Sequence, residues 1–110
     1  MTTPRTSAVE ERLQALGLAV PEVAKPVAVY VPAVVSGDLV FTSGQLPMRN
    51  GELMLTGKVG GEVSTEDAVE CARQCALNAI AAVKSQVGDL DRVVQVVKVV
   101  AFVASTPDFT

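Results

Sequence analysis

Histidine is absent from this chain of 110 residues, and cysteine occurs only twice. The absence of histidine excludes a Ser-His-Asp triad, a Cys-His pair and a zinc site with histidine ligands. Two cysteines are also too few to close a structural zinc site. Any catalysis must therefore use carboxylates, hydroxyls, Lys or Arg side chains, or backbone amides, and we expect neither a metal nor another cofactor.

Long apolar runs and a surplus of basic residues are missing as well. No run approaches the ~20 residues that a membrane span needs, and the N-terminal residues, with Arg5 and Glu10, lack the apolar core of a signal peptide. We therefore expect a soluble, cytoplasmic protein. Nine Lys and Arg residues against twelve Asp and Glu residues give a net charge of −3, which disfavours a dedicated nucleic-acid binder.

The two cysteines, Cys71 and Cys75, are four positions apart. On a helix this spacing places the Cβ atoms roughly 5–6 Å from each other, whereas a disulfide needs about 3.5–4.5 Å. We expect two reduced thiols that are largely buried.

The composition that is present, 49% hydrophobic and 19% charged residues, is typical of one folded domain with a modest core. At the start of the chain, Ser7 and Glu10 have the spacing of a capping box, and Gly17 stands where a helix would end. Residues 1–26 are therefore predicted to form a short amphipathic helix followed by an extended tether with two prolines.

A small antiparallel meander is predicted next. Its first strand covers residues 27–35, where Pro32 indicates an edge position or a bulge because proline cannot donate to a ladder. After a tight turn at residues 36–38, the second strand covers residues 39–42. Asn50-Gly51 is a strong hairpin signal and leads into a third strand at residues 52–56.

A long helix is predicted from Ser64 to about residue 87, where Gly88 ends it. Apolar residues recur every three or four positions along this segment, so one stripe of the helix is expected to face a core. The stripe consists of Val69, Ala72, Ala76, Ile80, Val83 and Val87.

Residues 93–104 form a long apolar segment that only Gln95 and Lys98 interrupt. Because apolar side chains occupy both alternating faces, we predict a strand that is buried on two sides. One helix covers only one face of a small sheet, so we infer a homo-oligomer; burial by other parts of the chain is the alternative.

The last residues have the pattern of a helix start, with Thr106 as the cap and Pro107 in the first helical position. The sequence stops at Thr110, within the first turn of that predicted helix. We therefore expect this chain to be an N-terminal portion of a longer polypeptide.

Several short segments follow one another along this chain in the same order as in the members of a known family. They are Tyr30, the run Thr42-Ser43-Gly44-Gln45-Leu46-Pro47, then Ala72-Arg73-Gln74, Gly88-Asp89-Leu90, and finally Phe102-Val103 with Asp108-Phe109. From about residue 27 to residue 110 the chain resembles the Rid family, also called the YjgF or endoribonuclease L-PSP family. The extra N-terminal helix is similar to one subgroup of it. Residues 27–110 are thus expected to form a Rid-like domain, incomplete at its C-terminus.

The resemblance implies a chorismate-mutase-like α+β fold, in which helices pack on one face of an antiparallel-rich mixed sheet, assembled as a homotrimer with clefts at the subunit seams. It also implies hydrolysis of reactive 2-imino acids and 2-aminoacrylate to 2-keto acids and ammonia. Family contacts to the small carboxylate substrate match Tyr30, Ser43 and Gly44 here. The family's substrate-clamping arginine and water-positioning glutamate are expected beyond Thr110, so no catalytic residue is assigned in this chain.

Other interpretations stay open for these residues and for the function. The Ser43 hydroxyl has an alternative role in satisfying a strand-end carbonyl, and Tyr30 has one as an edge-strand aromatic. Arg49 is close to the bend in sequence, but a solvated loop arginine explains it better than a substrate clamp. The main alternative function is a non-catalytic trimer that binds small carboxylates or has a regulatory role. Endoribonuclease activity fits less well with the acidic charge balance and the lack of histidine.

Overall fold

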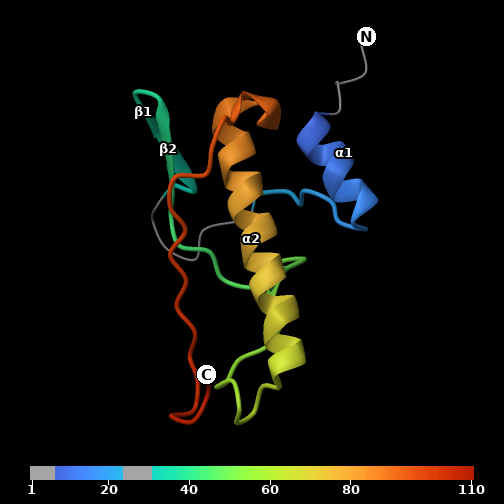
Figure 1. The fold of residues 1–110 in the computed structure, drawn as a ribbon, viewed down its shortest axis with the longest axis vertical. Helices are drawn as coiled ribbons and strands as arrows, with labels where there is room; N and C mark the ends of the chain where they lie inside the picture. The colour runs from blue at the N-terminus through green and yellow to red at the C-terminus, as the bar shows by residue number, and fades with distance from the viewer. Residues whose placement is uncertain (1–6, 24–30) are drawn as a thin grey trace.

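A computed structural model of the chain describes residues 7–23 and 31–110. A long helix runs along the molecule, with a β-hairpin on one side and a short helix on the other (Figure 1). This mixture of helices and antiparallel strands confirms the predicted α+β class. In chain order the elements are α1 (Ala8–Ala15), β1 (Ala33–Ser36), β2 (Leu39–Thr42), β3 (Met48–Arg49), β4 (Glu52–Leu53), α2 (Thr65–Val87) and the 3₁₀ helix η1 (Leu90–Arg92).

Helix α1 begins with the predicted capping box. The Ser7 hydroxyl accepts a hydrogen bond from the Glu10 N–H at 3.0 Å, and the Glu10 carboxylate accepts one from the Ser7 N–H at 3.4 Å. The helix buries none of its residues, and Leu16 at its C-terminal end is exposed. Apolar packing therefore contributes little to the attachment of α1, in contrast to what an amphipathic helix suggests.

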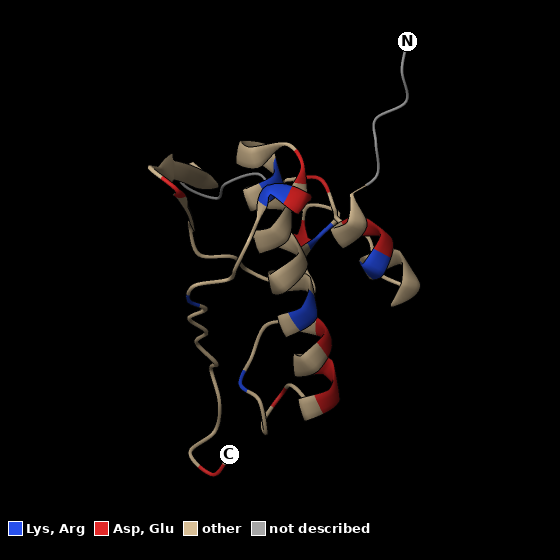
Figure 2. Cartoon of the chain, turned by 45° about the horizontal axis from the view of Figure 1, so that its top comes forward, with Lys and Arg blue, Asp and Glu red and all other residues tan. Residues whose placement is uncertain are grey.

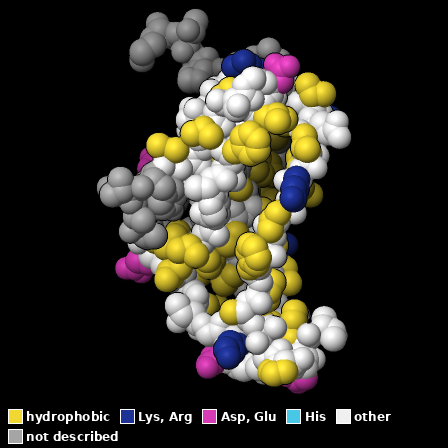
Figure 3. Space-filling view, turned by 90° about the vertical axis from the view of Figure 1, so that its left-hand side faces the viewer, with side chains coloured by type: hydrophobic (Ala, Val, Ile, Leu, Met, Phe, Trp, Pro, Cys, Tyr) yellow, Lys and Arg dark blue, Asp and Glu magenta, His cyan; other side chains and the backbone are white. Residues whose placement is uncertain are grey.

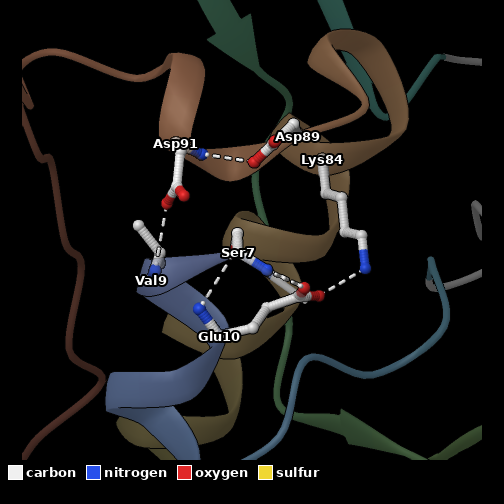
Figure 4. Close-up of polar contacts among 6 residues, drawn as sticks. All are labelled: Ser7, Val9, Glu10, Lys84, Asp89 and Asp91. Carbon is white, nitrogen blue, oxygen red and sulfur yellow. Dashed lines mark hydrogen bonds and ion pairs between the residues drawn. The ribbon is translucent and has the colours of Figure 1, made fainter. Parts of the chain in front are cut away.

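Polar contacts hold α1 against η1 and α2 (Figure 4). The Asp91 carboxylate accepts hydrogen bonds from the N–H groups of Ala8 at 2.8 Å and Val9 at 3.1 Å, so a residue far along the chain helps to cap this helix. Glu10 also forms an ion pair with Lys84 of α2. The hydrogen bond from Lys84 lowers the pKa of the Glu10 carboxyl below its ordinary value.

Strands β1 and β2 form an antiparallel hairpin with Ala33 opposite Thr42 and Ser36 opposite Leu39. The predicted turn at residues 36–38 is confirmed, since only two residues separate the strands. The first strand, predicted over residues 27–35, begins at Ala33 within the described chain, and residues 24–30 lie outside it. Pro32 precedes the β1–β2 ladder, and its carbonyl accepts a hydrogen bond from the Ser43 N–H.

The Asn50-Gly51 hairpin is also confirmed, and both residues have the positive φ that a type I′ turn requires, at 54° and 81°. The predicted continuous meander, however, is wrong. Strands β3 and β4 form a separate two-stranded sheet, and β4 is two residues long rather than five. At the start of β3, Asn78 of α2 donates hydrogen bonds to the carbonyls of Leu46 and Met48, so this part of the chain is attached to the helix.

Helix α2 has the predicted limits, with the Ser64 hydroxyl accepting a hydrogen bond from the Asp67 N–H at 3.1 Å and Gly88 at the C-terminal cap. The predicted apolar stripe does not form its buried face: Val69 is exposed, while the buried residues are Gln74, Leu77, Asn78, Ala81 and Ala82. The prediction failed because it counted only apolar residues. Two amide side chains belong to the buried face, and both are hydrogen-bonded there.

The core is small and lies where α2 packs on both strands of the β1–β2 hairpin and on η1. Ala81 and Ala82 of α2 are almost fully buried, so small side chains let the helix approach its neighbours closely. The other buried apolar residues are Ala33, Val59, Val63, Leu77 and Leu90.

The segment of residues 93–104 departs most from its prediction. It runs as an extended chain past α2 (Figure 1), but it belongs to no strand, and its side chains are exposed, including Val94 at 97% and Phe102 at 94%. The predicted two-sided burial is thus wrong for the described chain. A strand is buried on both faces only when it has paired neighbours and covering layers, and the two described hairpins do not extend to this segment.

The 93–104 segment is attached at its two ends. At the near end the Val93 N–H donates to the Leu90 carbonyl, and at the far end the Val59 N–H donates to the Ala104 carbonyl and the Thr106 N–H to the Val59 carbonyl. The Thr106 hydroxyl also donates to the Val59 carbonyl. The chain forms a single turn at residues 107–108 and no helix, so the predicted helix start is not present in this chain. Figure 3 faces the hairpin side of the molecule and shows hydrophobic side chains over much of that surface. The homo-oligomer inferred to cover these residues remains a prediction.

Candidate functional site

A pocket of about 220 Å³ opens on the β1–β2 hairpin, at the end where β2 stops. Its wall is mainly apolar, and the two residues with hydroxyl groups, Thr42 and Ser43, are adjacent in the chain. It is lined by Val31, Ala33, Val34, Phe41, Thr42 and Ser43. A volume of this size accepts a small molecule with a short apolar side chain, and the polar groups at the end of β2 are placed to fix its orientation.

Ser43, a predicted binding residue, lines this pocket and is half-buried. Its N–H and its hydroxyl both donate to the Pro32 carbonyl, at 3.0 Å and 3.2 Å. The open alternative, in which the hydroxyl satisfies a strand-end carbonyl, is therefore present in the structure. It does not remove the other role, because a hydroxyl that donates its proton still has lone pairs that accept a hydrogen bond from a ligand.

Gly44, the next predicted binding residue, is exposed directly after Ser43. Its N–H donates to no residue in the described part of the chain, so it is available to a ligand. A Cβ atom added at this position would meet no atom within 4 Å, which leaves room for a ligand to approach the backbone. Tyr30, the third predicted binding residue, lies outside the described residues.

The bend of residues 43–48, which connects β2 to β3, is attached to α2 by a side-chain network. The Asn78 amide donates to the carbonyls of Leu46 at 3.1 Å and Met48 at 3.0 Å. Gln74 donates to the Asn78 Oδ1 at 3.0 Å and accepts from the Arg49 Nε at 3.2 Å. Arg49 is exposed, as a loop arginine would be, but it is tied to the helix through this bond.

This network was not predicted from the sequence, although Gln74 belongs to the segments that carry the family resemblance. The signal that could have revealed it is the spacing of Gln74 and Asn78, which are one helical turn apart on a helix with an apolar face. Amide side chains at such positions are buried only with hydrogen-bond partners. Such a pair therefore indicates that backbone carbonyl groups lie nearby and need hydrogen-bond donors.

The charges of the molecule do not converge on the pocket. Lys and Arg residues are dispersed along the chain, and so are most Asp and Glu residues, apart from a small acidic group in the first turns of α2 that includes Glu66 and Asp67 (Figure 2). Among residues 7–23 and 31–110, no group of three His, Cys, Asp or Glu side chains is arranged to hold a metal ion. No helix in those ranges is long and apolar enough to cross a membrane.

The two cysteines on α2 are free, as predicted from their spacing, but they are half-buried rather than largely buried. Burial raises the pKa of the Cys75 thiol, and the neighbouring Cys71 raises it further. Because the thiolate is the reactive form of cysteine, Cys75 is a poor nucleophile at neutral pH.

Comparison with known proteins adds to this geometry. Residues 10–106 match the family described as "YjgF/chorismate_mutase-like, putative endoribonuclease". Protein TCP17 of Trypanosoma cruzi is 38% identical over 110 residues, which are all of this chain and 69% of that protein.

Two solved structures are similar in fold and sequence. The protein Atu1372 of Agrobacterium tumefaciens, described as of unknown function, has a TM-score of 0.81 and 42% identity, and the match covers 93% of this chain and 61% of that one. A protein of Shewanella oneidensis described as a putative endoribonuclease has a TM-score of 0.70 and 38% identity, with 76% and 55% covered. The chain thus spans less than two thirds of either structure, and the matches confirm the chorismate-mutase-like fold.

Proposed function

The chain belongs to the YjgF/chorismate mutase-like family, and on that basis we propose that it hydrolyses small 2-imino and enamine acids of the 2-aminoacrylate type to 2-keto acids and ammonia. The observation that supports this proposal is the pocket at the end of β2, where an apolar wall adjoins the Ser43 hydroxyl. Gly44 follows Ser43 directly, and its N–H donates to no residue in the described part of the chain. These groups match the three parts of such a substrate: a short side chain, an imine nitrogen and a carboxylate.

In the proposed mechanism, the Gly44 N–H donates to the substrate carboxylate and the apolar wall takes the side chain. The Ser43 hydroxyl, whose proton is directed to the Pro32 carbonyl, accepts a hydrogen bond from the imine N–H. A water molecule adds to the imine carbon, and the carbon–nitrogen bond then breaks, so that the nitrogen leaves as ammonia and the water oxygen becomes the keto oxygen. Tyr30 borders the cleft in this proposal.

We propose further that the cleft is completed by a neighbouring subunit in a homotrimer. The pocket is open to solvent on the isolated chain, and the exposed apolar residues of the 93–104 segment provide surface for association. A closed cleft would exclude bulk water and strengthen the polar contacts to the substrate.

The test is saturable ammonia release from 2-iminobutyrate by the purified protein. Gly44→Val would block approach to the N–H without a clash, because a Cβ atom there meets open space, and Ser43→Ala would remove the acceptor. Ser85→Ala is the matched control, since its hydroxyl also donates to a backbone carbonyl but lies on α2. We expect both pocket variants to lose activity and the control to keep it. A rate no higher than in buffer for the unmodified protein would contradict the proposal.

A second function, binding of a small carboxylate without turnover, is favoured by one observation. None of the six described residues that line the pocket has a titratable side chain, so they offer no general acid or base. Calorimetric titration with 2-oxobutyrate separates the two functions, because saturable binding without imine hydrolysis would support the binding protein.

Endoribonuclease activity, which the family description and one similar structure name, has less support from this chain. The chain has no histidine and a net charge of −3, and its basic residues do not gather on one face (Figure 2). RNA cleavage that co-purifies with the protein at constant specific activity would favour the ribonuclease over the deaminase.

A further inference from the structure

We propose that Asn78 and Gln74 are positioning residues for the pocket: they hold the bend of residues 43–48 in the one conformation that presents the Gly44 N–H to a ligand. This inference rests on the proposed function, because it deepens the description of the same site. It concerns two buried side chains of α2 that do not line the pocket.

Asn78 is only 2% exposed, and every hydrogen-bonding atom of its side chain has a partner. Its Nδ2 donates to the carbonyls of Leu46 and Met48, while its Oδ1 accepts from Gln74. The orientation of this amide follows from chemistry, since two carbonyl oxygens can only accept and must therefore face the NH₂ group. Asn78 thus supplies two hydrogen bonds that no apolar side chain could replace.

Gln74, at 7% exposed, fixes Asn78 in turn. Its Nε2 donates to Asn78 and its Oε1 accepts from the Nε of Arg49, so the network ends at a charged group on the surface. Arg49 is the one charged residue in these bonds among the described residues. A hydrogen bond to a charged donor is stronger than a neutral one, so Arg49 holds the Gln74 amide in its orientation.

Apart from the bonds to Asn78, the bend has few attachments: the Pro47 carbonyl accepts a hydrogen bond from the Met54 N–H at 3.0 Å, and the Gln45 side chain donates to the Ser43 carbonyl at 3.3 Å. Pro47 has no N–H, and the bond from the Met48 N–H to the Leu46 carbonyl spans only two residues. At its other end, Ser43 is attached to the Pro32 carbonyl. Gly44 and Gln45 therefore lie between Ser43, which is bonded to Pro32, and Leu46, which is bonded to Asn78. Without the Asn78 bonds, the nearest attachment after Gln45 to another part of the chain is at Pro47, and we expect the Gly44 N–H to change direction.

The test compares variants that remove the amide with one that only weakens packing. Asn78→Leu keeps a similar volume but has no donors, whereas Leu77→Ala leaves a cavity at the neighbouring buried position and keeps the amide network. The readouts are the Gly44 and Gln45 amide resonances, the dissociation constant of 2-oxobutyrate, and the separate values of KM and kcat for 2-iminobutyrate.

For Asn78→Leu we expect shifted Gly44 and Gln45 resonances and about a tenfold rise in KM and in the dissociation constant, as the loss of one well-placed hydrogen bond produces. Leu77→Ala should leave the resonances, KM and the dissociation constant near those of the unmodified protein, even if it lowers the free energy of unfolding as much as Asn78→Leu does. A folded Asn78→Leu protein with unmoved resonances and unchanged KM would overturn the proposal.

Two further variants keep the proposal testable if Asn78→Leu fails to fold. Gln74→Met removes only the outer part of the network, and we expect smaller shifts in the same resonances. Asn78→Asp presents a carboxylate to two carbonyls at neutral pH, but on acidification the protonated acid can donate to one of them, so the Gly44 resonance should return toward its normal position. A resonance that stays displaced at every pH would count against a donor role.

The resonance readout separates this proposal from the proposed function. If the unmodified protein shows no imine hydrolysis, the function is refuted, but the displaced bend in Asn78→Leu still confirms positioning. If hydrolysis is present and Asn78→Leu leaves both KM and the resonances unchanged, positioning is refuted and the function stands.

Discussion

The attachment of α1 depends on a carboxylate, and Asp91→Ala should release this helix from the rest of the molecule. Asp91 accepts from the N–H groups of Ala8 at 2.8 Å and Val9 at 3.1 Å, two of the donors that a helix N-terminus leaves unsatisfied. Loss of a capping side chain costs about 0.5–2 kcal/mol, and loss of a negative charge at a helix N-terminus costs about 0.3–1 kcal/mol more. Because α1 buries none of its residues, the other described contact that opposes its release is the ion pair between Glu10 and Lys84.

Amide hydrogen exchange measures this effect in each helix separately. A loss of about 1–2 kcal/mol raises the population of the open form roughly 5- to 30-fold, so the amides of Ala8–Ala15 should exchange faster by that factor while those of Thr65–Val87 are unchanged. Asp38→Ala is the control, since it removes the same charge from the turn between β1 and β2. Unchanged exchange in α1, or equal acceleration in both helices, would refute a local, carboxylate-dependent attachment.

Three more outcomes are expected. The pKa of the Glu10 carboxyl is lowered in the folded protein, mainly by its hydrogen bond with Lys84. The contribution of Glu10 to stability is therefore complete above the ordinary pKa of 4.5 and is lost as the pH falls through the lower folded value. Exchange in α1 should accelerate under acid, and Lys84→Met should reduce that acceleration, while an unchanged acceleration would contradict the role of the ion pair. Leu90→Ala should lower the free energy of unfolding by about 2–5 kcal/mol in urea titrations, because Leu90 is only 3% exposed, and a loss below that range would show that the core lies elsewhere. Gly60→Ala should destabilise the protein in the same assay, because its Cβ atom would lie 2.5 Å from the Thr106 hydroxyl oxygen at a φ of 92°, and an unchanged midpoint would contradict the observed contact.

The local structure could be predicted because its determinants are adjacent in the sequence. The capping box of Ser7 and Glu10, the Asn50-Gly51 turn and the end of α2 at Gly88 each depend on residues within one turn of chain. Burial could not be predicted in the same way. The 93–104 segment has the composition of a buried strand, but its burial depends on neighbours that its own sequence does not specify.

In the candidate site, too, the residue that depends on local sequence could be predicted, and the residues that depend on distant partners could not. Ser43 could be predicted to lie beside a pocket, since a strand that ends in small polar residues exposes backbone and hydroxyl groups. Asn78 was missed because its partners are the Leu46 and Met48 carbonyls, about 30 residues away, and every residue type has a backbone carbonyl, so the sequence does not mark these two. Gln74 was missed because its partners are the side chains of Asn78 and of the distant Arg49. The apolar periodicity of α2 even indicated another face of the helix, since the count left out both buried amides.

The measurement that decides whether the end of β2 is a binding site is a titration of the ¹⁵N-labelled protein with 2-oxobutyrate, followed through its amide resonances. We predict saturable shifts that are largest at Ser43 and Gly44, with smaller ones at Phe41 across the same pocket. Shifts confined to other parts of the molecule, such as α1 and η1, or no saturable shift at the end of β2, would contradict the proposed site.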